Sequence, residues 1–294
     1  MLTTVVQLLF QGVNMGLIYA LAGIGISLIW NASSLFNFSQ GDLLTLGGYA
    51  MLTLFAMMEL SYPVALIGTI VIMGCTGYIL SKFYFYPMFS EGLDQQVILI
   101  GTVSLSVLIR NSILLSWGAD PHTFANPFGK TPINLFGVNV MPHYFWNIII
   151  VAALIGVLQL FLRGTLIGTA MRAVAQRPYA ATLMGIKIEH MISLTFLLST
   201  SLAAISGILI APILPLTPEM GGLVNTKAFA AVLIGGLGSF AGALVGGIII
   251  GIAEVFFATL ITASYKDVFI FLMLIVFLMF KPGGIFEAKI SEKV

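Results

Sequence analysis

The chain has 294 residues, of which 59% are hydrophobic and 8% charged, and its formal net charge is +1. Soluble globular domains carry about 25% charged residues, so this composition and a mean hydropathy of +1.09 exclude an ordinary soluble domain. Residues 1–41 contain no charged side chain. Uncharged runs of this length suit helices of about 20 residues rather than barrel strands of roughly 10. We therefore expect an all-α, polytopic transmembrane helix bundle that forms a single domain over residues 1–294.

Apolar segments alternate with short polar interruptions along the chain, and we expect about eight membrane segments. In chain order they lie at about 5–30, 42–58, 62–81, 95–117, 144–162, 190–212, 228–263 and 268–280. A helix over 228–263 would be about 54 Å long at ~1.5 Å per residue, against a hydrocarbon core of roughly 30 Å. Because Gly235, Gly236 and Gly238 lie within it, we expect the helix to break there.

The N-terminal region contains a similar interruption, between Asn31 and Asp42, in which we expect Gly41 to break the helix. Non-helical backbone at membrane depth is tolerated only where protein or a water-filled cavity satisfies it. The two interruptions also share a pattern. Phe38-Ser-Gln-Gly41 precedes a glycine pair at 47–48, and Ser239-Phe-Ala-Gly242 precedes another at 246–247. Paired broken helices are the best sequence indication of a transport path, and the pattern suggests an inverted internal repeat of broken or re-entrant helices.

Two loops differ in charge, and this difference predicts their sides of the membrane. The segment 163–190 carries Arg163, Arg172, Arg177 and Lys187, and its basic character places it in the cytoplasm. The C-terminal tail, with Lys281, Lys289 and Lys293, is expected on the same side. The proline-rich stretch 118–142 is expected to form an ordered external loop.

The basic loop has an internal order that favours a docking role. Ala180 and Ala181 place small residues on a short helix, and Gly185 is expected to form the turn after it. Such a helix can fit into a cleft of a soluble subunit, with Arg172 and Arg177 pairing with acidic groups there.

Polar residues at membrane depth are candidates for a translocation path. They are Asn37, Ser39, Gln40, Asp42 and Glu254. A charge in the bilayer is costly, so Asp42 and Glu254 should face a cavity or a partner. The alternative for Asn37 and Asp42 is capping of a helix that starts near Leu43. Glu254 can instead meet a polar group on a neighbouring helix.

Two cations invite simpler interpretations. Arg110 lies close enough to the end of its segment to extend toward the membrane surface. Lys227 follows Asn225 and Thr226, and we expect an ordinary helix start with a surface lysine there. Helix N-terminal N–H groups that bind a carboxylate are the alternative.

Catalytic and metal-binding motifs are absent from the sequence. There is no Gly-x-x-x-x-Gly-Lys-Ser/Thr phosphate loop, and the histidines at 122, 143 and 190 do not have the spacing of a metal site. We expect no enzyme activity, no catalytic residues, no metal and no cofactor in this chain.

Several motifs resemble one family of permeases. Residues Ala180 to Gly185 match the Ala-Ala-x-x-x-Gly core of the cytoplasmic loop through which ABC importer permeases contact their ATPases. The stretches 16–25, 37–41 and 47–49, the glycine-rich 233–247, and Lys281-Pro-Gly-Gly-Ile-Phe286 resemble the branched-chain amino acid permease family. The resemblance covers nearly the whole chain.

This resemblance implies a complex in the bacterial inner membrane. ATP would be bound by two separate ATPase subunits, which contact the 163–190 loop. A second related permease, as a heterodimer rather than a homodimer, and an extracytoplasmic solute-binding protein would complete the importer. The expected substrate is a branched-chain or related small amino acid.

Other functions stay open at this point. The same family includes permeases for urea, short amides and other small polar solutes. An ATP-independent channel or facilitator also suits glycine-broken helices, but a channel has no need for a docking helix in its cytoplasmic loop. A scaffold subunit without a path is a third possibility, although Asp42 and Glu254 argue against it.

Overall fold

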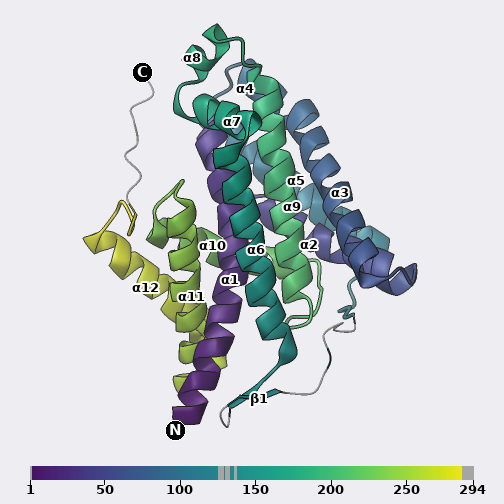
Figure 1. Ribbon diagram of the computed structural model, residues 1–294, viewed down its shortest axis with the longest axis vertical. Helices are drawn as coiled ribbons and strands as arrows, with labels where there is room; N and C mark the ends of the chain where they lie inside the picture. Colours follow the sequence, from purple (N-terminus) through teal and green to yellow (C-terminus); the bar gives the residue numbers. More distant parts are fainter. Residues whose placement is uncertain (1, 125–128, 130–132, 136–137, 287–294) are drawn as a thin grey trace. The chain divides into compact units, whose positions relative to one another are not determined.

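The computed structural model describes residues 2–124, 129, 133–135 and 138–286. Within these residues it confirms a polytopic helix bundle, in which seven helices are long and apolar enough to cross a membrane (Figure 1). The α-helices are α1 (Leu2–Ser33), α2 (Gln40–Met51), α3 (Tyr62–Leu80), α4 (Tyr86–Ser90), α5 (Gln95–Trp117), α6 (Pro142–Gly164), α7 (Leu166–Gln176), α8 (Pro178–Leu183), α9 (Ile188–Ile210), α10 (Met220–Gly235), α11 (Phe240–Leu260) and α12 (Lys266–Phe280).

Three short helical segments of other types extend these helices. The π-helical η1 (Leu52–Met57) continues α2, and η2 (Ser81–Phe85) connects α3 to α4. The expected segment at 42–58 therefore corresponds to α2 together with η1. The 3₁₀ turn η3 (Ala263–Tyr265) leads into α12.

The chain divides into two compact units. Unit 1 comprises residues 1–24, 125–155 and 224–288, and unit 2 comprises residues 25–124, 156–223 and 289–294. Helices α1, α6 and α10 contribute residues to both units. Each unit is described by itself below.

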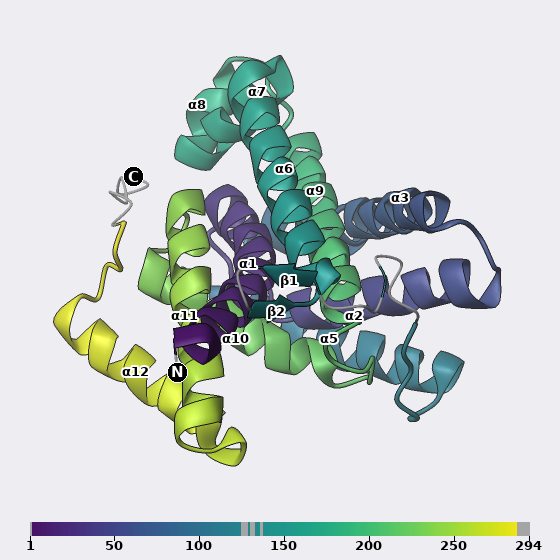
Figure 2. The ribbon, with the colours of Figure 1, turned by 60° about the horizontal axis from the view of Figure 1, so that its bottom comes forward.

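Unit 2 is built around α9, which packs against α2 and α3 (Figures 1 and 2). Small residues make this close packing possible. A Cβ atom on Gly47 of α2 would collide with Ala204 of α9, and one on Gly77 of α3 would collide with Thr200. Glycine at such positions lets helix backbones approach closely, as is common in membrane bundles.

The N-terminal break lies between α1 and α2, where residues 34–39 are not helical. Ser34 adopts a positive φ of 57°, which ends the α-helical path of α1. Gly41 is not at the break, contrary to the expectation from sequence, because it lies in the first turn of α2. Its backbone carbonyl instead approaches Gly221 of α10 so closely that no Cβ atom would fit there.

In unit 1, the first part of α1 packs closely against α11. A Cβ atom on Gly251 would collide with the backbone of Gly12 and Gly16, and one on Gly16 would collide with Gly247. Helix α12 follows α11 through η3 and lies beside it (Figures 1 and 2). The glycines of α11 therefore act as a packing face within the chain.

The second break, at the end of α10, is confirmed at the expected glycines. Gly235 is the last residue of α10, and Gly236 and Gly238 have φ values of +105° and +81°, which glycine adopts readily. The following Ser239 caps α11 by accepting a hydrogen bond from the Gly242 N–H at 3.0 Å. Helix α10 begins at Met220, eight residues earlier than the expected segment at 228.

The C-terminal motif closes this break. The N–H groups of Ile285 and Phe286 donate to the carbonyls of Ile234 and Gly235, at 2.8 and 2.9 Å. The last carbonyls of a helix have no partner within the helix, so the returning segment satisfies two of them. Lys289 and Lys293, which were expected in a cytoplasmic tail, lie outside the described residues.

The stretch 118–142, expected as an external loop, contains a short hairpin. Strands β1 (Ile133–Leu135) and β2 (Val138–Val140) pair antiparallel, with Ile133 opposite Val140. Parts of the stretch, at 125–128, 130–132 and 136–137, lie outside the described residues. Its side of the membrane stays a prediction.

Candidate functional site

The basic loop folds into two short helices in unit 2. Thr165 caps α7 by accepting a hydrogen bond from the Gly168 N–H at 3.0 Å. Helix α8 then starts with Pro178, whose missing N–H costs nothing in a first turn. The segment is ordered by its own sequence signals and is not a loose connection.

Gly185 ends α8 in the way predicted from the sequence. It has a φ of +78°, and nothing lies within 4 Å of the position where its Cβ atom would stand. The Ile186 N–H donates to the Ala181 carbonyl at 3.1 Å, and the Gly185 N–H donates to the Thr182 carbonyl at 2.9 Å. These two bonds form a Schellman motif, which needs a left-handed residue at this position.

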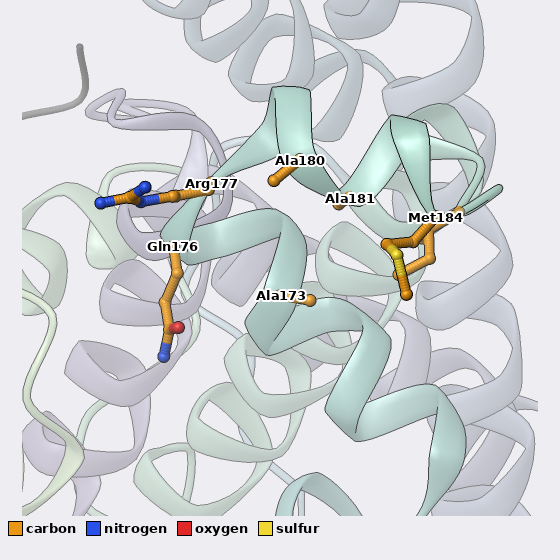
Figure 3. Close-up of a pocket in the computed structure, with 7 residues that line it drawn as sticks. Ala173, Gln176, Arg177, Ala180, Ala181 and Met184 are labelled. Carbon is orange, nitrogen blue, oxygen red and sulfur yellow. The ribbon is translucent and has the colours of Figure 1, made fainter.

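An open hollow of about 650 Å³ lies against α7 and α8 (Figure 3). The lining residues are Ala173, Gln176, Arg177, Ala180, Ala181, Met184 and Ile186. The two alanines differ, since Ala180 is exposed whereas Ala181 is buried within the chain. Figure 3 shows the Arg177 side chain extending away from both alanines.

The α8 region also carries exposed apolar side chains. Tyr179, Leu183 and Met184 of the α8 region are 79%, 72% and 82% exposed. Arg172 is also exposed and donates to Thr169 Oγ1 at 3.3 Å. A helix end that combines exposed apolar groups with arginines has the composition of a protein–protein contact.

The polar residues at the N-terminal break are buried in unit 2. Asn37 Oδ1 accepts hydrogen bonds from Ser39, from its N–H at 3.1 Å and from its hydroxyl at 2.6 Å. Gln40 Nε2 donates to the carbonyl and hydroxyl oxygens of Ser199 on α9, at 3.1 and 2.9 Å. Within the described part of the chain, Asn37 Nδ2 and Gln40 Oε1 are buried and have no hydrogen-bond partner.

Asp42 faces α5 rather than capping its own helix. Its side chain is 2% exposed and accepts a hydrogen bond from Ser106. It also forms an ion pair with Arg110, whose Nε lies 3.3 Å from Oδ1. The sequence position of Arg110 suggested a side chain that extends to the membrane surface. In the structure Arg110 is instead held by Asp42. The Ser39 side chain makes no capping bond to α2 either.

Glu254 lies in a charged cluster of unit 1. Its carboxylate pairs with Lys227 of α10 and, at 2.9 Å, with Lys266, and it accepts a hydrogen bond from Tyr19 at 2.6 Å. Lys227 also pairs with Asp267, at 3.1 Å. Glu254 thus meets polar groups on neighbouring helices, which was one of its two expected roles.

Lys227 was misassigned from the sequence. It lies in the middle of α10 and is 7% exposed, so it is neither at a helix start nor a surface lysine. A signal was available, because Lys227 and Glu254 are opposite charges within otherwise uncharged runs, and charges in membrane segments usually pair. Tyr19 carried no comparable signal.

Comparison with known proteins gives a consistent result. The family described as "Branched-chain amino acid transport system / permease component" matches residues 8–278. The high-affinity branched-chain amino acid transport system permease protein LivH of Escherichia coli (strain K12) is 30% identical, with 98% of this chain and 97% of LivH covered. The corresponding protein BraD of Pseudomonas aeruginosa is 31% identical with the same coverage.

A third relative is covered over a slightly smaller share of both chains. The probable branched-chain amino acid transport permease protein LivH of Methanocaldococcus jannaschii is 29% identical, covering 90% of this chain and 87% of the relative. No solved structure is significantly similar to this chain.

Proposed function

Because the chain belongs to the branched-chain amino acid permease family of ABC importers, we propose that it forms the membrane path for branched-chain or related small amino acids. The chain is the permease, a multi-pass membrane protein, and works with ATPase and solute-binding partners. We place it in the bacterial cytoplasmic membrane. Hydrolysis of ATP belongs to the partner subunits, and this chain needs no cofactor of its own.

The α7–α8 segment is the observation that carries this proposal. Its Schellman turn at Gly185 fixes where α8 ends, and its exposed side chains at Tyr179, Leu183 and Met184 need a covering partner. A facilitator that works without ATP has no use for such a segment. In the proposed complex, closure of the ATPases moves α8 and thereby changes access to the path.

The remaining members of the complex follow from the same proposal. Two ATPase subunits require two permease segments of this kind, and a second, related permease supplies the other. A solute-binding protein outside the membrane delivers the amino acid and selects it. The candidates for lining the path are buried polar and charged side chains, namely Asn37, Ser39, Gln40 and Asp42 in unit 2 and Glu254 in unit 1.

A substitution at Gly185 tests the coupling role. Gly185→Val places a β-branched residue at a φ of +78° and should distort the turn, whereas open space around the position leaves packing intact. Gly92→Val is a matched control, because Gly92 has a φ of +66° and also has nothing within 4 Å. ATP-driven leucine uptake lost in Gly185→Val but kept in Gly92→Val supports the proposal, and equal uptake in both variants contradicts it.

A further inference from the structure

We propose that Arg110 of α5 binds the α-carboxylate of the transported amino acid. This inference rests on the proposed function, because it names a substrate-contacting group within the proposed path. Four observations in unit 2 carry it: the place of Arg110 in its helix, the way Asp42 holds it, its partly exposed side chain and the space beside Gly222.

Arg110 lies within α5, nearer to its C-terminal end. It is 15 residues after Gln95 and 7 residues before Trp117, the ends of α5. At ~1.5 Å per residue these separations are about 22 and 10 Å. A charged side chain at such depth faces a water-filled cavity or a partner rather than lipid.

Asp42 holds the guanidinium in place. Arg110 Nε lies 3.3 Å from Asp42 Oδ1, and Ser106 donates a hydrogen bond to Oδ2 of the same carboxylate. Because the Asp42 side chain is only 2% exposed, it is a fixed support that cannot follow Arg110 to the surface. The pair is therefore preorganised, with one edge of the guanidinium occupied.

The Nη end of the guanidinium is not the part that pairs with Asp42. The Arg110 side chain is 41% exposed, and its ion pair with Asp42 is made through Nε. Arginine has five N–H donors in a rigid fork, which matches the two oxygens of a carboxylate. An amino acid presents such a carboxylate whatever its side chain.

Gly222 leaves room for that carboxylate. A Cβ atom built on Gly222 would have a single neighbour within 4 Å, Arg110 Nη2 at 3.6 Å. The space in front of Nη2 is thus bounded by a residue without a side chain. The methyl group of Gly222→Ala should leave most of this space free. The ring of Gly222→Phe should occupy it and cover the guanidinium.

The test uses cysteine chemistry on the reconstituted importer with its ATPases, second permease and binding protein. Arg110→Cys is combined with Asp42→Asn, which avoids an unpaired buried carboxylate, in a Cys75→Ser background that removes the cysteine already present. Leu108→Cys in the same background is the control, because Leu108 is an exposed apolar residue of the same helix.

Water-soluble methanethiosulfonates then report on position 110. We expect the cysteine there to react, with leucine and binding protein slowing the reaction, and Leu108→Cys to stay unmodified. A trimethylammonium adduct should restore part of the uptake, and a sulfonate adduct should not. The maximal rate of uptake should be roughly tenfold higher with the trimethylammonium adduct than with the sulfonate adduct. The leucine concentration for half-maximal uptake is set by the binding protein and should be the same with both adducts.

The opposite results overturn the inference. An unreactive cysteine at 110 would mean that Arg110 faces lipid headgroups or another chain. Reaction without protection by leucine, or uptake that is indifferent to the charge of the adduct, would mean that no substrate carboxylate binds there.

The glycine variants give a second, independent readout. Gly222→Phe should lose uptake while Gly222→Ala keeps it, and equal uptake in both overturns the inference. A parent complex that takes up no leucine would instead be a failure of the proposed function, so the two failures are distinguishable.

Discussion

Lys227 and Glu254 form an ion pair between α10 and α11 in unit 1, although they lie 27 positions apart in the sequence. Both side chains are more than nine-tenths buried, and Lys266, Asp267 and Tyr19 complete their contacts. Buried charges are tolerated only when each has a partner. The cluster therefore ties the short helix α10 to the helices that follow it.

Removal of one charge should destabilise the protein strongly. Glu254→Gln leaves Lys227 with Asp267 alone and removes the anion from Lys266. Breaking a buried pair in this way costs about 3–5 kcal/mol. We expect a clear fall in the midpoint of thermal unfolding in detergent. Glu91→Gln, the same chemical change at an exposed residue, should leave the midpoint unchanged, and a similar midpoint for both variants would argue against the cluster.

The contact between α1 and α11 in unit 1 should be sensitive to the size of the side chains in it. Gly251→Ala places a methyl group against the backbone of Gly12 and Gly16, and overpacking of this kind costs about 1–3 kcal/mol. Gly156→Ala of α6 is the control, since nothing lies within 4 Å of its added methyl group. We expect a lower unfolding temperature for Gly251→Ala only. Equal temperatures would mean that these helices are not in close contact.

The C-terminal motif gives a prediction for truncated chains. Ending the chain after residue 280 removes the two N–H groups that bind the carbonyls of Ile234 and Gly235, whereas ending it after Phe286 keeps both bonds. Unsatisfied backbone groups in a membrane protein cost several kcal/mol each. The shorter chain should therefore aggregate in size-exclusion chromatography, and the longer one should elute as the full-length protein does. Identical elution of the two truncated chains would mean that the C-terminal motif does not stabilise the second break.

Arg177 should contribute to ATPase docking through its charge. It is exposed at the junction of α7 and α8, and charges at the edge of an interface mainly change association rate and salt dependence. Arg177→Glu should reduce recovery of the ATPases in pull-downs, most clearly at low ionic strength, while Arg177→Lys retains most of it. Unchanged recovery of the ATPases with Arg177→Glu at all salt concentrations would place Arg177 outside the contact.

Turns and helix breaks depend on local sequence, whereas contacts between distant helices do not. The turn at Gly185 and the break at Gly236 and Gly238 are visible in the sequence because each needs a positive φ that glycine adopts readily. Gly41 was expected at a break but lies in the first turn of α2, and the glycine that a close approach requires there is Gly221, whose added Cβ atom would collide with the Gly41 carbonyl. A glycine alone does not distinguish these two uses.

Contacts between distant residues were not available from local patterns. The Asp42–Arg110 pair joins residues 68 positions apart, and Arg110 was expected to reach the membrane surface by itself. Apolar windows also placed the start of α10 at residue 228, so Lys227 looked like a helix terminus. The Asp42–Arg110 and Lys227–Glu254 pairs can be recognised only once it is known which helices pack together.

The most direct test of the account is leucine uptake into proteoliposomes that contain this chain, its ATPases, a second permease and the binding protein. We predict accumulation of leucine above the external concentration, dependent on ATP and on the binding protein, and lost with Gly185→Val but not with Gly92→Val. Leucine that only equilibrates across the membrane, at the same rate without ATP and in both variants, would contradict an ATP-driven importer and identify the chain as a facilitator.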